Sequence, residues 1–223
     1  MKLLKRLIYV LIFLLICYCI SFSFLNKANL KPVNAQLNDL DLSGFNKLMI
    51  VAHPEDETVW GGVHLLSDNY LVVCVSCGFD SKKEKKMEKV LEITKDRLVK
   101  LGYSDKFLVR RHYRGVKKRI KKILNYKTWE LVVTHNPDGE TGNLEHKQIS
   151  EIVSNLDIYN LYYFGNYYNK KELIKLDKVT TLKGDLIKDK INVLIKTYHD
   201  KNLNNYKHMF PFEDWISREN YKV

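Results

Sequence analysis

A histidine and three carboxylates follow an apolar run near residue 50. The run is Leu48-Met49-Ile50-Val51-Ala52, and His53, Glu55, Asp56 and Glu57 come after it. Such a run is typical of a buried strand, and open α/β sheets bind ligands at the carboxyl ends of their strands. Imidazole and carboxylate groups are zinc ligands, and a carboxylate can also take a proton from water. The stretch is therefore a candidate hydrolytic metal site, although carboxylates also favour the start of a helix.

A second polar loop, 135–146, follows another apolar run at 129–134. Asn143 is a suitable N-cap for the helix predicted after it, which places Asn143 and His146 on the same side. The ends of neighbouring parallel strands lie at one edge of a sheet, so His53 and Asp56 can meet His146 there. Two histidines and one carboxylate with an open position form the pattern of a catalytic zinc site.

Strand and helix patterns alternate along the chain. Apolar or β-branched runs predict strands at 48–52, 70–76, 107–109, 129–134 and 159–164. Helical spacing of apolar residues predicts helices at 60–67, 82–101, 116–124, 146–156 and 186–201. This alternation indicates βαβ units. We therefore expect an α/β fold, a Rossmann-like three-layer sandwich with a mostly parallel sheet.

The N-terminal segment is apolar. Residues 7–25 carry no charge and follow the basic flank 1–6. Their length predicts a transmembrane anchor, with a cleaved signal peptide as the alternative. Residues 26–44 would then be a stalk and 45–223 the folded domain. Because basic residues are more frequent before the run than after it, we expect a single-pass membrane protein with its N-terminus in the cytoplasm and its domain outside.

The chain is basic, with a net charge of +11. Its lysines are dispersed and no nucleic-acid-binding motif accompanies them, so we expect a solvated surface and no nucleic-acid partner. A basic module that binds anionic polymers at a membrane surface is the alternative. Cys74 and Cys77 form a single C-x-x-C, too little for a zinc ribbon. On one strand the two side chains would point to opposite faces, which predicts buried thiols, with a disulfide as the alternative.

The two polar loops resemble the signatures of a known family. Ala52-His53-Pro54-Glu55-Asp56-Glu57 resembles the A-H-P-D-D-E motif of the PIG-L/LmbE family of zinc-dependent N-deacetylases, and the loop 139–146 is similar to its G-x-Y/S-G-H-x-x-H motif. The resemblance extends over about residues 46–200 and implies removal of an acetyl group from an N-acetylated amino sugar, of the N-acetylglucosamine type, in a glycoconjugate. It implies zinc, or another divalent metal, as the cofactor.

The resemblance also implies roles for particular residues. His53, Asp56 and His146 match the family's metal ligands, and Glu55 stands at the position of its general-base aspartate. Asn143 replaces a histidine, and we expect it to stabilise the oxyanion as the second catalytic residue.

These departures from the family pattern leave an alternative open. Glu55 is one methylene longer than aspartate, and Asn143 cannot act as an imidazolium. A catalytically weakened relative that binds glycan or metal without turnover is therefore the second hypothesis. Aromatic residues such as Tyr167 and Tyr168 either stack on a sugar ring or pack the core.

Overall fold

The computed structural model describes residues 2–25, 29–79, 81–104, 109–175, 185–199 and 201–222. The strands are β1 (Lys47–Val51), β2 (Tyr70–Cys74), β3 (Arg97–Lys100), β4 (Leu131–Thr134), β5 (Leu161–Tyr163) and β6 (Ile216–Ser217). The helices are α1 (Lys2–Leu25), α2 (Val33–Asn38), α3 (Asp56–Ser67), α4 (Lys82–Thr94), α5 (Val109–Leu124), α6 (Gly139–Gly142), α7 (Leu144–Ser154), α8 (Lys170–Lys175), α9 (Asp185–Asp189) and α10 (Lys196–Tyr198), with a π-helical segment η1 (Lys190–Ile195) and a 3-10 segment η2 (Lys201–Met209).

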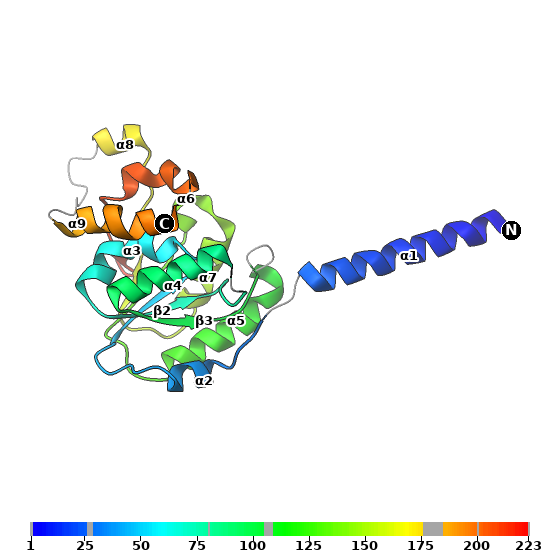
Figure 1. Cartoon of the computed structure of the whole chain (residues 1–223), viewed down its shortest axis with the longest axis horizontal. Coiled ribbons are helices and arrows are strands. Elements are labelled where there is room, and N and C mark those ends of the chain that lie inside the picture. Colours follow the sequence, from blue (N-terminus) through cyan, green and yellow to red (C-terminus); the bar gives the residue numbers. More distant parts are fainter. Residues whose placement is uncertain are drawn as a thin grey trace.

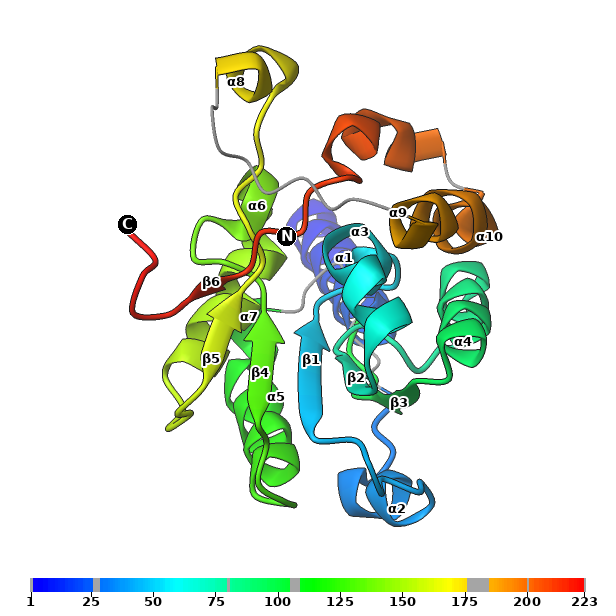
Figure 2. The same cartoon turned by 90° about the vertical axis from the view of Figure 1, so that its left-hand side faces the viewer.

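The strands form one sheet in the order β3-β2-β1-β4-β5-β6. Neighbouring strands from β3 to β5 are parallel, and β6 alone pairs antiparallel, with β5. Figure 2 shows β1, β4 and β5 pointing the same way, with α5 and α7 on one side of the sheet and α3 and α4 on the other. The predicted Rossmann-like fold with a mostly parallel sheet is therefore confirmed.

The sheet is buried on both faces because its strands place alternate residues on opposite sides. In β1, Leu48 and Ile50 pack into one apolar cluster with α5 and α7, whereas Met49 and Val51 pack into the other with α3 and α4. This explains why the strands are continuous apolar runs and do not alternate with polar residues. The arrangement fixes the carboxyl ends of β1 and β4 side by side.

Two predicted elements differ from the structure. The predicted helix 82–101 ends as α4 at Thr94, because Lys95 adopts a left-handed conformation with φ of 66°. Within the rest of that range, Arg97–Lys100 form β3. The predicted strand at 107–109 falls mainly outside the described residues, and Val109 is the first residue of α5. Leu98 and Leu101 fit a helical stripe by spacing alone, which is why the sequence pattern misassigned them.

The cysteine pair also differs from the expected buried thiols. Cys74 and Cys77 form a disulfide, with their Cα atoms 5.4 Å apart. Cys74 is the last residue of β2, and the chain turns directly after it. The two side chains therefore face each other across a turn and do not point to opposite faces of a strand.

The N-terminal helix α1 extends away from the rest of the described chain (Figure 1). Lys2, Lys5 and Arg6 lie inside this helix, so charged residues occupy its first turns. Among the described residues, no helix is both long and apolar enough to cross a membrane. The predicted transmembrane anchor at 7–25 is therefore wrong, and so is the predicted localisation as a single-pass membrane protein. Within the predicted stalk, Val33 and Leu37 of α2 are buried in the core.

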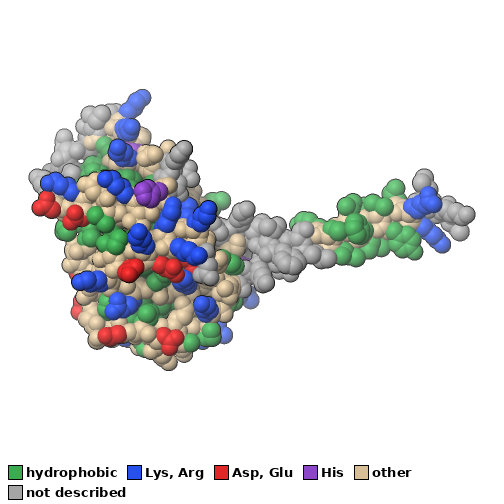
Figure 3. All heavy atoms as spheres, viewed as in Figure 1, with side chains coloured by type: hydrophobic (Ala, Val, Ile, Leu, Met, Phe, Trp, Pro, Cys, Tyr) green, Lys and Arg blue, Asp and Glu red, His purple; other side chains and the backbone are tan. Residues whose placement is uncertain are grey.

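Basic side chains are spread over the face shown in Figure 3, with acidic ones among them. The C-terminal segments cover α3 on the same side of the sheet as α4. There the Lys190 ammonium of η1 is buried and donates to Glu213 Oε1 over 2.6 Å and to the Val59 carbonyl over 2.8 Å. Burial lowers the pKa of Lys190, and the Glu213 carboxylate opposes this shift. This buried ion pair attaches the C-terminal part of the chain to α3.

Candidate functional site

Three polar atoms converge at the carboxyl edge of the sheet. His53 lies two residues beyond β1, Asp56 is the first residue of α3, and His146 lies in the first turn of α7. Asp56 Oδ2 is 3.4 Å from His53 Nδ1 and 3.3 Å from His146 Nε2, and the two nitrogens are 3.3 Å apart. The structure thus brings together the three residues that the sequence singled out as metal ligands.

The triangle formed by these atoms has the size that a metal ion requires. Zinc–nitrogen and zinc–oxygen bonds measure about 2.0–2.2 Å, so the ligand atoms of a tetrahedral site lie about 3.3–3.5 Å apart. The three distances in the protein, 3.3, 3.3 and 3.4 Å, agree with this spacing. His53, Asp56 and His146 could therefore hold a metal ion.

Two further glutamates orient the histidines. Glu145 pairs with His53 Nε2, which leaves Nδ1 to face Asp56 and His146. Glu140 Oε2 lies 2.5 Å from His146 Nδ1, which leaves Nε2 to face the same point. Carboxylates in this outer position fix the orientation of metal-binding histidines. Sequence reasoning missed both glutamates, and the only local signal was that Glu145 directly precedes His146.

His135 lies behind this triangle and is fully buried. The Ala52 N–H donates to its Nε2 over 2.9 Å. Its other nitrogen, Nδ1, therefore carries the proton and donates to Glu140 Oε2 over 3.1 Å. Because Nε2 already accepts a hydrogen bond, it has no proton for Asp56 Oδ2, 3.4 Å away. His135, Glu140 and His146 form a second group of possible ligands, but their hydrogen bonds to one another explain that arrangement.

Asp56 and its two histidine partners shift one another's pKa values. Burial raises the pKa of Asp56, but the neighbouring histidines, His146 above all, outweigh it and hold the pKa well below its usual range. Burial lowers the pKa of His53, but the Asp56 and Glu145 carboxylates raise it to about 10. Asp56 and Glu140 act in the same way on His146, raising its pKa to about 9. The carboxylates of Asp56, Glu140 and Glu145 thus favour positive charge at this point, and a metal cation would replace the histidine protons there.

Glu55 has a strained backbone, with φ of 94°. Its N–H donates to Glu57 Oε2 over 3.0 Å and to the Tyr198 hydroxyl over 3.1 Å. Non-glycine residues rarely adopt positive φ, and such strain costs about 1–3 kcal/mol and gathers at functional sites. The buried carboxylate of Glu57 also accepts from the Tyr198 hydroxyl over 2.5 Å, so α10 helps to hold Glu55 in place.

The side chain of Glu55 lines a cavity together with those of His53, Asp56 and His146. One oxygen pairs with Lys83 of α4, and the other, Oε2, is buried without a hydrogen-bond partner among the described residues. Burial raises the pKa of Glu55 to about 7, with Asp56 acting in the same direction and Lys83 and His53 opposing. A carboxyl that titrates near neutral pH suits a general base. The orphaned oxygen is available for water or for a polar group of a ligand.

Asn143 begins α7 and lines the cavity. Its Oδ1 accepts from the backbone N–H groups of Glu145 over 2.8 Å and His146 over 3.3 Å. This cap fulfils the predicted role as a helix start and leaves the side-chain NH₂ group as a donor. The cavity has a volume of about 150 Å³. The side chains that line it are those of His53, Glu55, Asp56, Val59, Trp60, Lys83, Thr141, Asn143, His146, Leu203 and Tyr206.

Comparison with solved structures finds a similar fold in a deacetylase. The match is to the crystal structure of a deacetylase triple mutant from the teicoplanin biosynthetic pathway, with a TM-score of 0.54 and 15% identity, covering 74% of this chain and 87% of the other. The chain has a deacetylase-like fold. At the level of the fold, this confirms the resemblance to the PIG-L/LmbE family.

Sequence comparison finds a viral relative. An uncharacterized protein of Acanthamoeba polyphaga mimivirus is 25% identical over 197 residues, which are 79% of this chain and 76% of the relative. No family model matches the chain. The comparisons therefore support the fold, and the candidate metal site rests on the geometry of the residues described above.

Proposed function

We propose that this protein is a zinc-dependent deacetylase that hydrolyses the N-acetyl group of an amino sugar of the N-acetylglucosamine type in a glycoconjugate. The observation that carries the proposal is the triangle of His53 Nδ1, Asp56 Oδ2 and His146 Nε2, whose edges fit a tetrahedral metal site. The deacetylase-like fold and the position of Glu55 beside this triangle support the same conclusion.

The proposed reaction is the hydrolysis of an amide by water. A zinc ion held by the three ligands would supply a Lewis acid that polarises the amide carbonyl and lowers the pKa of water. Glu55 takes a proton from the attacking water as the water oxygen bonds to the carbonyl carbon. The carbon–nitrogen bond then breaks, and the amine nitrogen receives a proton from Glu55. The products are acetate and a free amino sugar.

Two other residues of the cavity assist the proposed reaction, Asn143 by stabilising developing charge and Lys83 by orienting Glu55. The NH₂ group of Asn143 is available to donate to the carbonyl oxygen as it becomes negative, because the side-chain oxygen is occupied by the helix cap. Such donors stabilise the transition state when they are held in place beforehand. Lys83 pairs with one oxygen of Glu55 and thereby orients the other oxygen towards the reacting water.

The test combines metal analysis with an assay of acetate release from N-acetylglucosamine conjugates, using the purified full chain. We expect about one divalent ion per chain. Glu55→Gln should keep the metal and lower acetate release by about 10²–10⁴-fold, the usual contribution of a general base. His53→Ala should lose both, and the exposed Glu151→Gln should change neither. A chain without stoichiometric divalent metal after reconstitution would refute the proposal.

A binding protein without turnover is the second candidate. It is favoured by two observations: Asn143 is committed to capping α7, and Glu55 is longer than the family's aspartate and held by Lys83. This candidate predicts bound metal and saccharide binding without acetate release. In that case Glu55→Gln should leave saccharide affinity unchanged, whereas His53→Ala should weaken it.

A further inference from the structure

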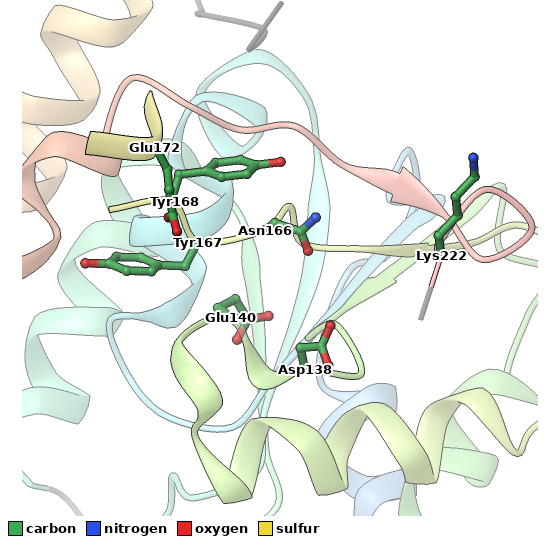
Figure 4. A pocket seen from close by; sticks show the side chains of 7 residues that line it. All are labelled: Asp138, Glu140, Asn166, Tyr167, Tyr168, Glu172 and Lys222. Atoms are coloured by element: carbon green, nitrogen blue, oxygen red, sulfur yellow. The ribbon is translucent and has the colours of Figure 1, made fainter. Parts of the chain in front are cut away.

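A second cavity, of about 500 Å³, lies beside the candidate active site. Figure 4 shows Tyr168 and Glu172 on one side of it and Glu140 and Asp138 on the opposite side, with Asn166 between them. Its volume is within the range of about 300–1,000 Å³ that small-molecule sites occupy. No residue proposed above as a metal ligand or catalytic group lines this cavity.

The two cavities are separated by a single layer of side chains. Glu140 lines the second cavity and contacts His146, which lines the first. Tyr167 of the second cavity meets Tyr206 of the first edge to face, with ring centroids 6.3 Å apart. The adjacency of the two cavities suits a ligand whose neighbouring units occupy one cavity each.

The first cavity is too small for such a ligand alone. Its volume of about 150 Å³ is below the usual range for drug-sized ligands. It suits the acetamido group and the part of the sugar that carries it. The remainder of an acceptor must lie outside it, and the second cavity is the adjacent hollow.

The chemistry of the second cavity fits a neutral sugar ring. Tyr168 offers an aromatic face for the C–H groups of a sugar and a hydroxyl for its polar groups. The Asn166 amide and the Asp138 carboxylate, which accepts from the Tyr221 hydroxyl over 2.8 Å, present hydrogen-bonding groups suited to sugar hydroxyls. The carboxylates of Asp138 and Glu172 against the single ammonium of Lys222 disfavour a phosphate or another anion.

We infer that the second cavity binds the sugar ring next to the one that is deacetylated, so the acceptor is an oligosaccharide or a glycoconjugate with at least two sugars. This inference rests on the proposed function for the position of the first sugar. It assigns Tyr168 and Asn166 to recognition of the second sugar and gives them no part in the reaction.

Steady-state kinetics with the full chain tests this inference. N-acetylglucosamine and its disaccharide serve as the two substrates. Tyr168→Ala should lower kcat/KM for the disaccharide by about tenfold, equivalent to about 1.4 kcal/mol, and leave the monosaccharide value unchanged. Tyr168→Phe should keep most of the stacking, and Tyr159→Ala, which removes a 93% exposed tyrosine, should have no effect. An equal loss for both substrates, or no loss for either, would overturn the inference.

Calorimetric binding of the disaccharide separates this inference from the proposed function. The background is the Glu55→Gln chain, with and without Tyr168→Ala. If no substrate releases acetate but Tyr168→Ala still weakens disaccharide binding about tenfold, the second-sugar site stands and the deacetylase assignment fails. If acetate is released but Tyr168→Ala does not weaken binding, the reverse holds. Should Tyr168→Ala not fold, Asn166→Ala, at the other residue assigned to the second sugar, provides the same comparison.

Discussion

His146 belongs to two neighbouring groups of side chains, and the groups differ in their surroundings. With His53 and Asp56 it forms a triangle that lines a cavity, called here the open triangle. With His135 and Glu140 it forms a second, buried group, called here the sealed group, in which the imidazole rings of His135 and His146 stack with centroids 3.8 Å apart. The residue types are nearly the same in both groups.

The difference lies in where the lone pairs point. In the open triangle, Glu145 and Glu140 engage the outer nitrogens of the histidines, so the inner nitrogens are left for a cation. In the sealed group, His135 uses both nitrogens for hydrogen bonds, to Ala52 and Glu140. A cluster of histidines and carboxylates thus becomes a metal site only where backbone and side-chain partners leave lone pairs facing a cavity.

Substitution of the shared residue should have the largest effect. His146→Ala removes a ligand from the open triangle and leaves the buried Glu140 with one imidazole partner fewer. We expect loss of bound metal and of acetate release, together with a lower melting temperature, measured by metal analysis and thermal unfolding. Its counterpart His53→Ala, which touches only the open triangle, should lose metal with a smaller drop in melting temperature. Equal drops would mean that the two groups are not distinct in this way.

Glu140 and Glu145, which contact the outer nitrogens of the metal-binding histidines, should contribute unequally to metal affinity. Glu140→Gln and Glu145→Gln are each expected to weaken metal binding by about 10–100-fold, as removal of such partners does elsewhere. Glu140→Gln should be the more severe, because Glu140 is buried and contacts two histidines, whereas Glu145 is half-buried and contacts one. Competition with a metal chelator measures both. A larger loss of metal affinity for Glu145→Gln than for Glu140→Gln would contradict this prediction.

The open triangle could be predicted from the sequence because its signal is local. His53 and Asp56 follow an apolar strand, and His146 follows a capping asparagine, so spacing and strand order predicted that they could meet. The resemblance to the family motifs then assigned them as metal ligands. The four strands β1, β2, β4 and β5 were recognisable for the same reason, as continuous apolar runs.

The supporting contacts had no such signal. His53 and Glu145 are 92 residues apart in the chain, and the pairing depends on how α7 packs beside β1. The strand β3 was hidden because Leu98 and Leu101 also fit a helical period. The antiparallel β6 contains only two residues, too few to form a pattern, and its position is set by the tertiary contacts of the C-terminal segment.

The sealed group should contribute more to the free energy of unfolding than to metal binding. His135→Phe keeps a ring in the stack but leaves the buried Ala52 N–H without its acceptor and removes one of the partners of Glu140, which keeps His146. We expect the free energy of unfolding to fall by about 1–3 kcal/mol, measured by urea denaturation, while the folded protein still binds one metal ion. Loss of metal from a folded variant would show that His135 belongs functionally to the open triangle.

A buried carboxylate without a histidine beside it completes the comparison. Asp96 accepts from the Tyr70 N–H over 2.7 Å and from the Thr94 hydroxyl over 2.6 Å. Burial raises its pKa from 3.8 to about 7, the opposite direction to Asp56 and Glu140. The unfolded chain loses this proton near pH 4, whereas the folded chain keeps it to about pH 7. The contribution of Asp96 to stability is therefore full below about pH 4 and is lost as the pH rises towards 7.

Asp96→Asn should remove this dependence, because asparagine keeps an acceptor for Tyr70 and offers a donor to the Thr94 hydroxyl, which itself can donate to the Val90 carbonyl. The unfolding free energy of the natural chain minus that of the variant should fall by about 1 kcal/mol per pH unit between pH 4 and pH 7. Denaturation curves at several pH values measure this difference. A constant difference would mean that Asp96 is ionised in the folded chain, and that burial alone does not set the protonation of the carboxylates in this fold.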